Sequence, residues 1–276
     1  MAAGAVSGPD GPEARPCLLL PCDAIPNLRD VGGYQTSDGR RIRTGLLYRS
    51  TALDRASDAD LSRLYERGIR TVFDLRTAAE REASPDRVLD DAAMVNLDVM
   101  ADAPGAPPAR IAQLTSQPQK ASRLLARTDI DATLDAAYRG LVSLPSARAA
   151  YHELFLALAD RDALPALYHC TTGKDRTGWA TAALLLLLGV PESDVIDDYL
   201  LSNGYLLAEL QPVLDRFAAN GGDPELLKPV LGVKERYLRT ALAEVHERYG
   251  TIESYFMDGL GLDADARQRL RDTFLD

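Results

Sequence analysis

The stretch "YHCTTGKDRTGWATAALLLLLGV", residues 168–190, decides how the chain folds around one cysteine. The segment "ALPALYH" (163–169) leads into the cysteine and has the apolar character of a short buried strand. The segment "RTGWATAALLLLL" (176–188) is rich in leucine and predicts a buried helix. The loop between them, residues 170–176, therefore lies at the N-terminus of that helix.

This loop has the features of an anion-binding site. A helix N-terminus presents unpaired backbone N–H groups and the positive end of the helix dipole. Gly173 allows the backbone to curl so that several N–H groups converge, and Arg176 adds two parallel donors that match two phosphate oxygens. We expect a tetrahedral oxyanion to bind to Cys170, Thr171, Thr172, Gly173, Lys174, Asp175 and Arg176.

Cys170 has the surroundings of a nucleophile. Cysteine thiols titrate near pH ~8.5 in water, but at roughly 3.5–7.5 at helix N-termini beside cations. We therefore expect Cys170 to be a thiolate at neutral pH, lying under a bound phosphate and aimed at phosphorus. Thr177 is placed to donate its hydroxyl to this thiolate.

The composition indicates a folded protein without a nucleic-acid partner. The 276 residues are 46% hydrophobic and carry a net charge of −10, whereas a nucleic-acid binder needs a basic face. Cys17, Cys22 and Cys170 are too few and too widely spaced for a disulfide framework or a zinc site. We expect no metal or cofactor, and a reducing compartment is the simplest location.

Residues 1–16 lack the basic start and apolar core of a signal peptide. The longest apolar run, "WATAALLLLLGV" (179–190), is too short to span a bilayer. We expect a soluble protein that is cytoplasmic, or exported without a recognisable signal peptide.

Outward from the loop, strands alternate with helices in the N-terminal half. Ser57 with Asp60, and Thr77 with Glu80, have the spacing of helix capping boxes. This alternation predicts an α/β fold with a central, mainly parallel sheet flanked by helices. The expected strands are 41–50, 69–76, 94–100 and 164–169, and the expected helices here are 57–68 and 77–83.

The remaining segments are mostly helical. Residues 101–109 read as a loop, and 110–145 have helical periodicity without a strand, which predicts a helical insertion. A helix at 146–160 follows, and the region after 191 predicts a helical C-terminal layer on the sheet. We expect the Gly-, Pro- and Ala-rich residues 1–22 to be disordered, and residues 23–276 to form a single domain.

The motif "HCTTGKDRTG" (169–178) resembles the loop of the cysteine-dependent protein tyrosine phosphatases. More narrowly, the chain resembles the bacterial tyrosine/serine phosphatase family. Further blocks that resemble this family are "IPNLRDVGGYQTSDGRRIRTGLLYRSTAL" (25–53), "GIRTVFDLRTAAE" (68–80), "DVIDDYLLSN" (194–203) and "GVKERYLRTALAEVHERYGTIESYF" (232–256).

The resemblance implies a protein-tyrosine-phosphatase-like fold in which residues 110–145 are a helical lid. By position it makes Cys170 the nucleophile and Arg176 the phosphate ligand. It makes Lys174 and Asp175 the family's additional loop residues. Members act on phosphotyrosine, phosphoserine or phosphothreonine, and sometimes phosphoinositides. Thr172 departs from the family, which usually has alanine there, so substrate preference follows less directly than the reaction.

The general acid has two candidates. Asp74, in "FDLR", matches the position proposed for this role in the family, but it could instead be a structural partner of Arg76. Asp175 is the alternative acid, and it could also orient Arg176 or a water molecule.

Three further residues are expected to support the site. His169 fits a hydrogen-bonding residue behind the nucleophile better than a proton shuttle. Arg29 and Asp30, in "NLRDVGG", are expected to brace the loop from below.

These features predict a metal-independent phosphomonoesterase that acts through a cysteinyl-phosphate. Its partner would be a phosphorylated protein or a phosphoinositide. Two alternatives stay open: a rhodanese- or arsenate-reductase-like cysteine enzyme, and a catalytically silent phosphate-binding module. The sequence does not reveal the physiological substrate or the oligomeric state.

Overall fold

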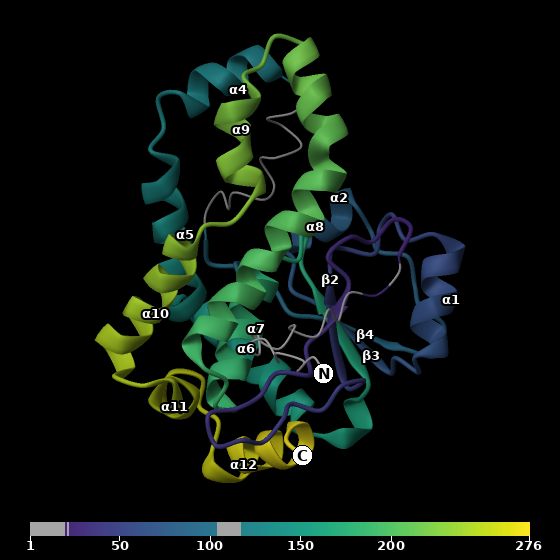
Figure 1. Cartoon of the computed structure of the whole chain (residues 1–276), viewed down its shortest axis with the longest axis vertical. Coiled ribbons are helices and arrows are strands. Elements are labelled where there is room, and N and C mark those ends of the chain that lie inside the picture. Colours follow the sequence, from purple (N-terminus) through teal and green to yellow (C-terminus); the bar gives the residue numbers. More distant parts are fainter. Residues whose placement is uncertain (1–19, 21, 104–116) are drawn as a thin grey trace, which may run out of the picture.

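A five-stranded sheet lies at the centre of the computed structural model (Figure 1). The structure describes residues 20, 22–103 and 117–276, apart from the side chains of 207–209. The strand order is β1-β2-β5-β3-β4, and only the β1–β2 pair is antiparallel, so the predicted mainly parallel sheet is confirmed. The strands are β1 (Arg29–Asp30), β2 (Leu47–Ser50), β3 (Thr71–Asp74), β4 (Ala93–Asn96) and β5 (Ala166–His169).

Both faces of the sheet are covered, because side chains alternate along each strand. Phe73 and Tyr168 point into the larger core, which includes residues of α6 (Pro145–Leu158) and α7 (Arg176–Leu187). Val72 and Leu167 point into a smaller core on the other face. Helix α1 (Asp58–Glu66) contributes Leu64 to that second core and lies on the opposite side of the sheet from α6 and α7 (Figure 1).

The two predicted capping boxes are present. Ser57 accepts a hydrogen bond from the Asp60 amide and caps α1, and Thr77 accepts one from the Glu80 amide and caps α2 (Ala78–Ala83). In each box the acidic side chain also accepts from the amide of the capping residue. Local sequence alone therefore set the starts of both helices.

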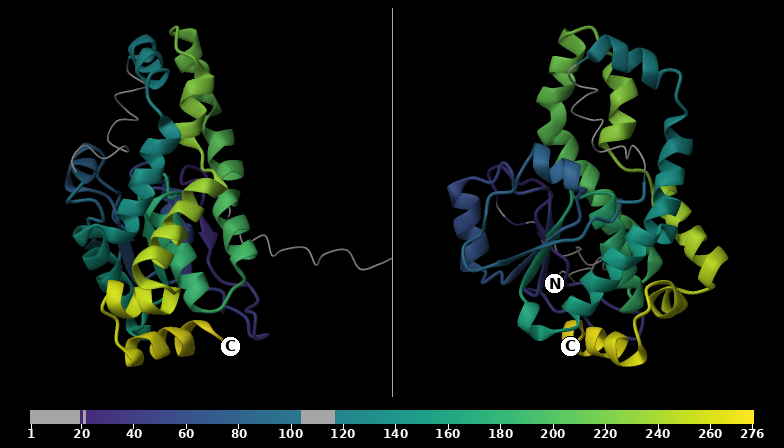
Figure 2. Two further views of the ribbon diagram at one scale, coloured as in Figure 1. Left: turned by 90° about the vertical axis from the view of Figure 1, so that its left-hand side faces the viewer. Right: turned by 180° about the vertical axis from the view of Figure 1, so that it is seen from behind.

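The C-terminal half is helical, as predicted. Its long helix α8 (Glu192–Ala219) passes the sheet and reaches an upper lobe that stands above it. The lobe is formed by α4 (Pro118–Leu125), α9 (Pro224–Leu231) and the end of α8 (Figures 1 and 2). Ala121, Leu125, Phe217 and Leu227 are among the buried residues that hold this lobe together. The helices are α4 (Pro118–Leu125), α5 (Ile130–Ser143), α8 (Glu192–Ala219), α9 (Pro224–Leu231), α10 (Glu235–Tyr249), α11 (Ile252–Ser254) and α12 (Ala264–Phe274), with short turns η1 (Arg161–Ala163) and η2 (Tyr255–Gly259).

Some predicted boundaries were wrong. The strand expected at 41–50 is β2 at Leu47–Ser50, preceded by isolated bridges at Arg41 and Ile42. The strand expected at 94–100 ends at Asn96. The two-residue edge strand β1 was not predicted, because so short a segment has no periodicity to detect.

Parts of two further expectations lie outside the described residues. These are the disordered segment at 1–22, of which only residues 20 and 22 are described, and residues 104–116 of the predicted loop and insertion. The described part of the insertion is helical. Its helix α5 buries Leu134, Tyr138, Leu141 and Val142 in the larger core.

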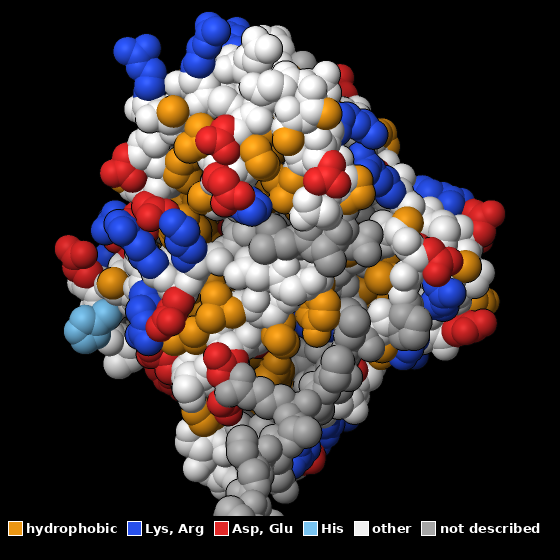
Figure 3. All heavy atoms as spheres, turned by 45° about the horizontal axis from the view of Figure 1, so that its top comes forward, with side chains coloured by type: hydrophobic (Ala, Val, Ile, Leu, Met, Phe, Trp, Pro, Cys, Tyr) orange, Lys and Arg blue, Asp and Glu red, His pale blue; other side chains and the backbone are white. Residues whose placement is uncertain are grey.

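The surface around the upper lobe has a mixed character. On the face turned toward the viewer in Figure 3, basic and acidic side chains alternate, with hydrophobic side chains between them. No single sign of charge dominates the described residues there. Within the described ranges, no helix combines the length and hydropathy needed to cross a membrane.

Candidate active site

The predicted strand–loop–helix arrangement is present. Strand β5 lies between β2 and β3, and the loop leaves its C-terminal end and enters α7 at Arg176. Gly173 has a φ of +64°, and a Cβ there would lie 2.2 Å from the carbonyl oxygen of Ser50. Only glycine fits this curl, as the sequence predicted.

The backbone amides and carbonyls of the loop differ in their hydrogen bonding. Among the hydrogen bonds of the described residues, none is donated by an amide between Thr171 and Arg176. The carbonyls of the loop, in contrast, are occupied. Those of Thr171 and Gly173 accept from the Ala52 amide (3.2 Å) and from Arg49 Nη2 (2.7 Å), respectively. Because these carbonyls are bonded to residues outside the loop, the loop amides remain available to bind an anion.

A buried ionic network holds the loop from below. Asp198 accepts from Arg29 Nε at 3.1 Å and from Arg49 Nη1 at 3.0 Å, and all three side chains are buried. Burial by itself would raise the pKa of Asp198, but the two arginines lower it below its ordinary value. Arg49 and Asn27 both donate to the Gly173 carbonyl, so the network fixes the loop curl.

Of the two residues predicted to brace the loop, the network includes Arg29 but not Asp30. The Asp30 carboxylate accepts from the amides of Gly32 (2.8 Å) and Gly45 (2.6 Å) and so stabilises the turns beside β1 instead. Arg49, Asp198 and Asn27 were not predicted as site residues.

Arg176 is held by a glutamate. Its Nη1 and Nη2 donate to Oε2 and Oε1 of Glu80 at 2.7 and 2.8 Å. Burial would raise the pKa of Glu80, but the Arg176 guanidinium outweighs it and lowers the pKa to about 2. Thr171 Oγ1 also donates to Glu80. The capping-box spacing predicted a structural role for Glu80, and the same carboxylate also orients Arg176.

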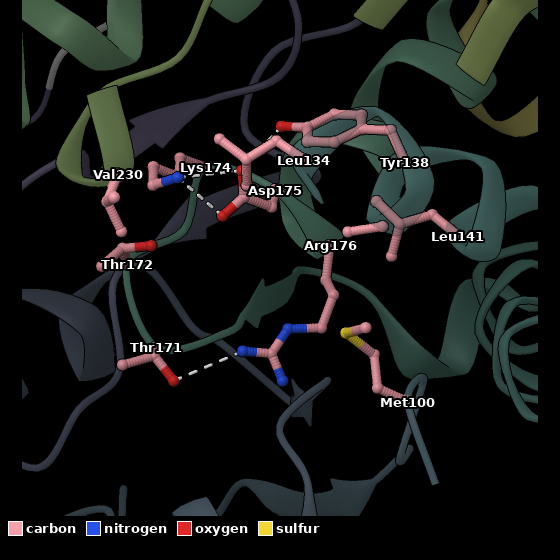
Figure 4. A pocket seen from close by; sticks show the side chains of 11 residues that line it. Met100, Leu134, Tyr138, Leu141, Thr171, Thr172, Lys174, Asp175, Arg176 and Val230 are labelled. Atoms are coloured by element: carbon pink, nitrogen blue, oxygen red, sulfur yellow. Dashed lines mark hydrogen bonds and ion pairs between the residues drawn. The ribbon is translucent and has the colours of Figure 1, made fainter. Parts of the chain in front are cut away.

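A pocket opens above the loop (Figure 4). Its polar floor is made by residues of the loop, and its walls are mostly apolar. The floor residues are Thr171, Thr172, Lys174, Asp175 and Arg176, and the wall residues are Met100, Leu134, Ala137, Tyr138, Leu141 and Val230. The Cys170 side chain is not among them: the residue is only 1% exposed, at the start of the loop.

Asp175 lines the pocket and is anchored on two sides. Lys174 Nζ lies 2.9 Å from Asp175 Oδ1 and 2.8 Å from Oδ2, and the Tyr138 hydroxyl donates to Oδ1 at 2.7 Å. The Asp175 side chain keeps 24% of its surface exposed. It makes no capping hydrogen bond to α7, so the first turn of that helix has no side-chain cap.

Asp74, the other candidate acid, is not brought to the pocket. Both of its carboxylate oxygens accept from Arg76, with Nε–Oδ1 at 2.9 Å and Nη2–Oδ2 at 2.8 Å, and the residue is 2% exposed. The geometry matches the structural alternative for Asp74.

His169 lies behind the nucleophile, between carboxylates. Its Nδ1 is 3.2 Å from the Cys170 carbonyl, and its Nε2 is 3.2 Å from Asp86 Oδ2. Asp74, Asp86 and His169 come close enough to hold a metal ion. Arg76 already bonds both carboxylates and supplies the positive charge, so we assign this cluster a structural role.

The Thr177 hydroxyl is buried and has no hydrogen-bond partner among the described residues. The predicted hydrogen bond from Thr177 to the Cys170 sulfur is therefore not formed in this structure. Tyr151, which was not predicted, donates its hydroxyl to the Arg176 carbonyl at 3.0 Å and fixes the start of α7.

Known proteins resemble this chain over most of its length. The profile of the tyrosine phosphatase family matches residues 20–276. A Cupriavidus necator protein with the provisional name tyrosine-protein phosphatase is 32% identical over 246 residues, covering 88% of this chain and 85% of that protein. The triple specificity protein phosphatase PtpB of Mycobacterium tuberculosis is 30% identical over 272 residues, covering 90% of this chain and 96% of PtpB. A tyrosine-protein phosphatase of Nostoc commune is 28% identical over 228 residues, covering 81% and 72%.

Proposed function

The chain belongs to the tyrosine phosphatase family, and from this premise we propose that it hydrolyses phosphoric monoesters through a cysteinyl-phosphate on Cys170. The main supporting observation is that, among the described residues, the backbone amides from Thr171 to Arg176 donate no hydrogen bond. The Thr171 and Gly173 carbonyls, in contrast, accept hydrogen bonds from residues outside the loop. Such a row of donors suits the three terminal oxygens of a phosphoryl group.

The reaction proceeds in two steps. The Cys170 thiolate attacks phosphorus, the ester P–O bond breaks, and Asp175 gives its proton to the leaving oxygen. Asp175 then takes a proton from a water molecule, whose oxygen attacks phosphorus, and the S–P bond breaks to release inorganic phosphate and the thiolate. The loop amides and Arg176 stabilise the equatorial oxygens in both steps.

We assign the acid to Asp175 because a general acid must reach the leaving oxygen. Asp175 lines the pocket and is partly exposed. Asp74 is buried, and Arg76 occupies both of its oxygens. Asp74 is also not among the residues that line the pocket, so a proton on its carboxylate would not reach a leaving oxygen bound there.

The pocket walls favour an aromatic ester. Leu134, Leu141 and Met100 offer apolar contacts to a ring whose phosphate lies on the polar floor. We therefore propose phosphotyrosine as the main substrate. Phosphoserine, phosphothreonine and phosphoinositides are proposed as further substrates, because Lys174 adds a cation to the floor and PtpB is named a triple specificity phosphatase. Thr172 also lines the floor, next to Lys174 in the chain.

Turnover of para-nitrophenyl phosphate in EDTA tests the reaction class. We expect undiminished turnover with chelator, since protein donors supply all the charge stabilisation in the proposed steps. A silent phosphate-binding module would bind phosphate without turnover. A rhodanese would transfer sulfur and an arsenate reductase would consume thiol with arsenate, each without releasing para-nitrophenol. Rates on phosphotyrosine peptides, phosphoserine peptides and phosphoinositides then rank the substrates.

A further inference from the structure

Helix α5 touches the site in two ways at once. Leu134, Tyr138 and Leu141 follow helical spacing, so all three lie on one face of α5, and all three line the pocket. Figure 4 shows the Tyr138 hydroxyl directed toward Asp175, on the side away from Arg176. The helix that shapes the apolar wall therefore also contacts the acid.

The hydroxyl groups around Asp175 form a chain with one direction. Tyr138 OH lies 2.7 Å from Asp175 Oδ1 and 2.5 Å from the hydroxyl of Tyr199 on α8. Burial raises the pKa values of Tyr138 and Tyr199 well above the ordinary value, so both stay protonated. A carboxylate only accepts, so Tyr138 donates to Asp175 and Tyr199 donates to Tyr138.

The direction of this chain makes Oδ2 the oxygen of Asp175 with fewer hydrogen-bond partners. Oδ1 accepts from Tyr138 and from Lys174, while Oδ2 has only the 2.8 Å contact with Lys174. Hydrogen bonds in series strengthen one another, which fixes the carboxyl plane. Oδ2 is then the oxygen that carries the proton to and from the substrate.

The rest of α5 is held firmly enough to place Tyr138. Asp135 pairs with Arg236 on α10 (Nε–Oδ2 3.0 Å), and Asp131 pairs with Lys234 (2.6 Å). The Tyr138 ring packs edge-to-face on Tyr199, with centroids 6.2 Å apart. The hydroxyl position is thus set by packing of three helices and not by the loop alone.

We propose that Tyr138 is a positioning residue for the acid–base step, holding Asp175 through a hydrogen bond that Tyr199 orients. This rests on the proposed function, since it takes Asp175 as the acid. It makes the protonation of the leaving group depend on Tyr138 of α5, which lies 37 residues before Asp175 in the sequence.

The test compares two substrates with the same ring. Phenyl phosphate has a poor leaving group that needs protonation, and para-nitrophenyl phosphate has a good one that needs little. We expect Tyr138→Phe to lower kcat on phenyl phosphate about tenfold, part of the ~10²–10⁴-fold that a positioned acid supplies. On para-nitrophenyl phosphate we expect kcat to change by less than about threefold, because this leaving group needs little protonation. The basic limb of the pH profile on phenyl phosphate should flatten.

Tyr237→Phe is the matched control. It removes a partly buried hydroxyl that donates to Asp131, another aspartate, on α5. The Tyr237 ring packs beside the Tyr138 ring, but its hydroxyl does not contact Asp175. In this control, the ratio of kcat on para-nitrophenyl phosphate to kcat on phenyl phosphate should stay at the wild-type value. Tyr199→Phe should also raise the ratio of kcat on para-nitrophenyl phosphate to kcat on phenyl phosphate, by a smaller factor than Tyr138→Phe. This variant replaces Tyr138→Phe in the test if Tyr138→Phe does not fold.

A double-mutant cycle decides the outcome. If Tyr138 acts through Asp175, adding Tyr138→Phe to Asp175→Asn should not raise the rate ratio further. The proposal is overturned if Tyr138→Phe and Tyr199→Phe slow both substrates equally, or if the ratio still rises in the Asp175→Asn background. Failure of the proposed function would look different, because the wild type would then turn over neither ester.

Discussion

Glu80 on α2 and Arg176 at the start of α7 form a two-pronged ion pair, with Nη1–Oε2 at 2.7 Å and Nη2–Oε1 at 2.8 Å. Glu80 therefore has two functions. Its carboxylate completes the capping box with Thr77 at the start of α2, and it fixes the Arg176 guanidinium above the loop. Because both side chains are buried, water cannot solvate the charge that remains when one partner is removed.

Glu80→Gln should therefore damage both activity and stability. Misplacing a binding group by about 1 Å can cost on the order of 100-fold in rate, so we expect kcat/KM to fall roughly 10- to 100-fold. Breaking a buried pair typically costs about 3–5 kcal/mol in the free energy of unfolding. Steady-state kinetics and urea unfolding measure the two effects. An unchanged kcat/KM would mean that Glu80 does not orient Arg176.

The same pair predicts a pH dependence of stability. The pKa of Glu80 falls from 4.5 to about 2 on folding, so the folded state favours the charged form. The stabilisation is complete above pH 4.5 and is lost as the pH falls through this window. The free energy of unfolding should drop more steeply between pH 4.5 and about pH 2 in wild type than in Glu80→Gln. Parallel curves would contradict the assignment.

Arg176→Lys should not be a conservative change. Lysine provides a point charge, whereas the Arg176 guanidinium has five N–H groups and can pair with Glu80 and still donate to the phosphate. One lost donor typically costs about 10²–10³ in kcat. The exposed Arg40→Lys, whose partner Asp38 lies on the surface, is the control and should keep full activity. A loss below about threefold for Arg176→Lys would mean that this arginine does not hold the phosphate.

The two candidate acids can be separated by leaving group. Asp175→Asn should slow phenyl phosphate by about 10²-fold or more and para-nitrophenyl phosphate much less. Asp74→Asn should instead reduce stability, because it weakens the buried pair with Arg76, and should leave the ratio of the two rates unchanged. If Asp74→Asn alone shifted that ratio, the acid would be Asp74.

Asp198→Asn tests the network under the loop. The change keeps the shape but leaves two buried arginines without a counter-charge, which should cost about 3–5 kcal/mol in the free energy of unfolding. Inorganic phosphate should also inhibit more weakly, because Arg49 no longer fixes the Gly173 carbonyl. The control Asp38→Asn breaks an exposed pair, worth about 0–1 kcal/mol. Equal stability losses in both variants would contradict the network's role.

The sequence predicted those parts of the site that depend on neighbours along the chain. The strand–loop–helix unit, Gly173, and the capping boxes at Ser57 and Thr77 all follow from local spacing. The partners that hold the site are distant: Glu80 lies 96 residues from Arg176, and Arg49 lies 124 residues from Gly173. One sequence carries no signal for such pairs, so the roles of Glu80, Arg49, Asp198 and Tyr138 in the site emerged only from the fold.

Asp74 illustrates the same limit. Its place at the end of a buried strand fits a ligand-facing carboxylate as well as a structural one. The nearby Arg76 made the structural alternative visible in the sequence, and the fold adds that Asp86 shares the same guanidinium. The decision between the two readings depended on which side chain faces the pocket, a property of tertiary packing.

The most direct test is to identify the atom that carries the phosphoryl group. Wild-type enzyme would be mixed with excess para-nitrophenyl phosphate, quenched in acid within one turnover, and digested for mass spectrometry. We predict one phosphoryl group on the peptide that contains Cys170, and none in Cys170→Ser, whose kcat should fall on the order of 10⁴-fold or more while phosphate still binds. A phosphoryl group on any other residue, or a Cys170→Ser enzyme with a tenth of the wild-type rate, would contradict the account.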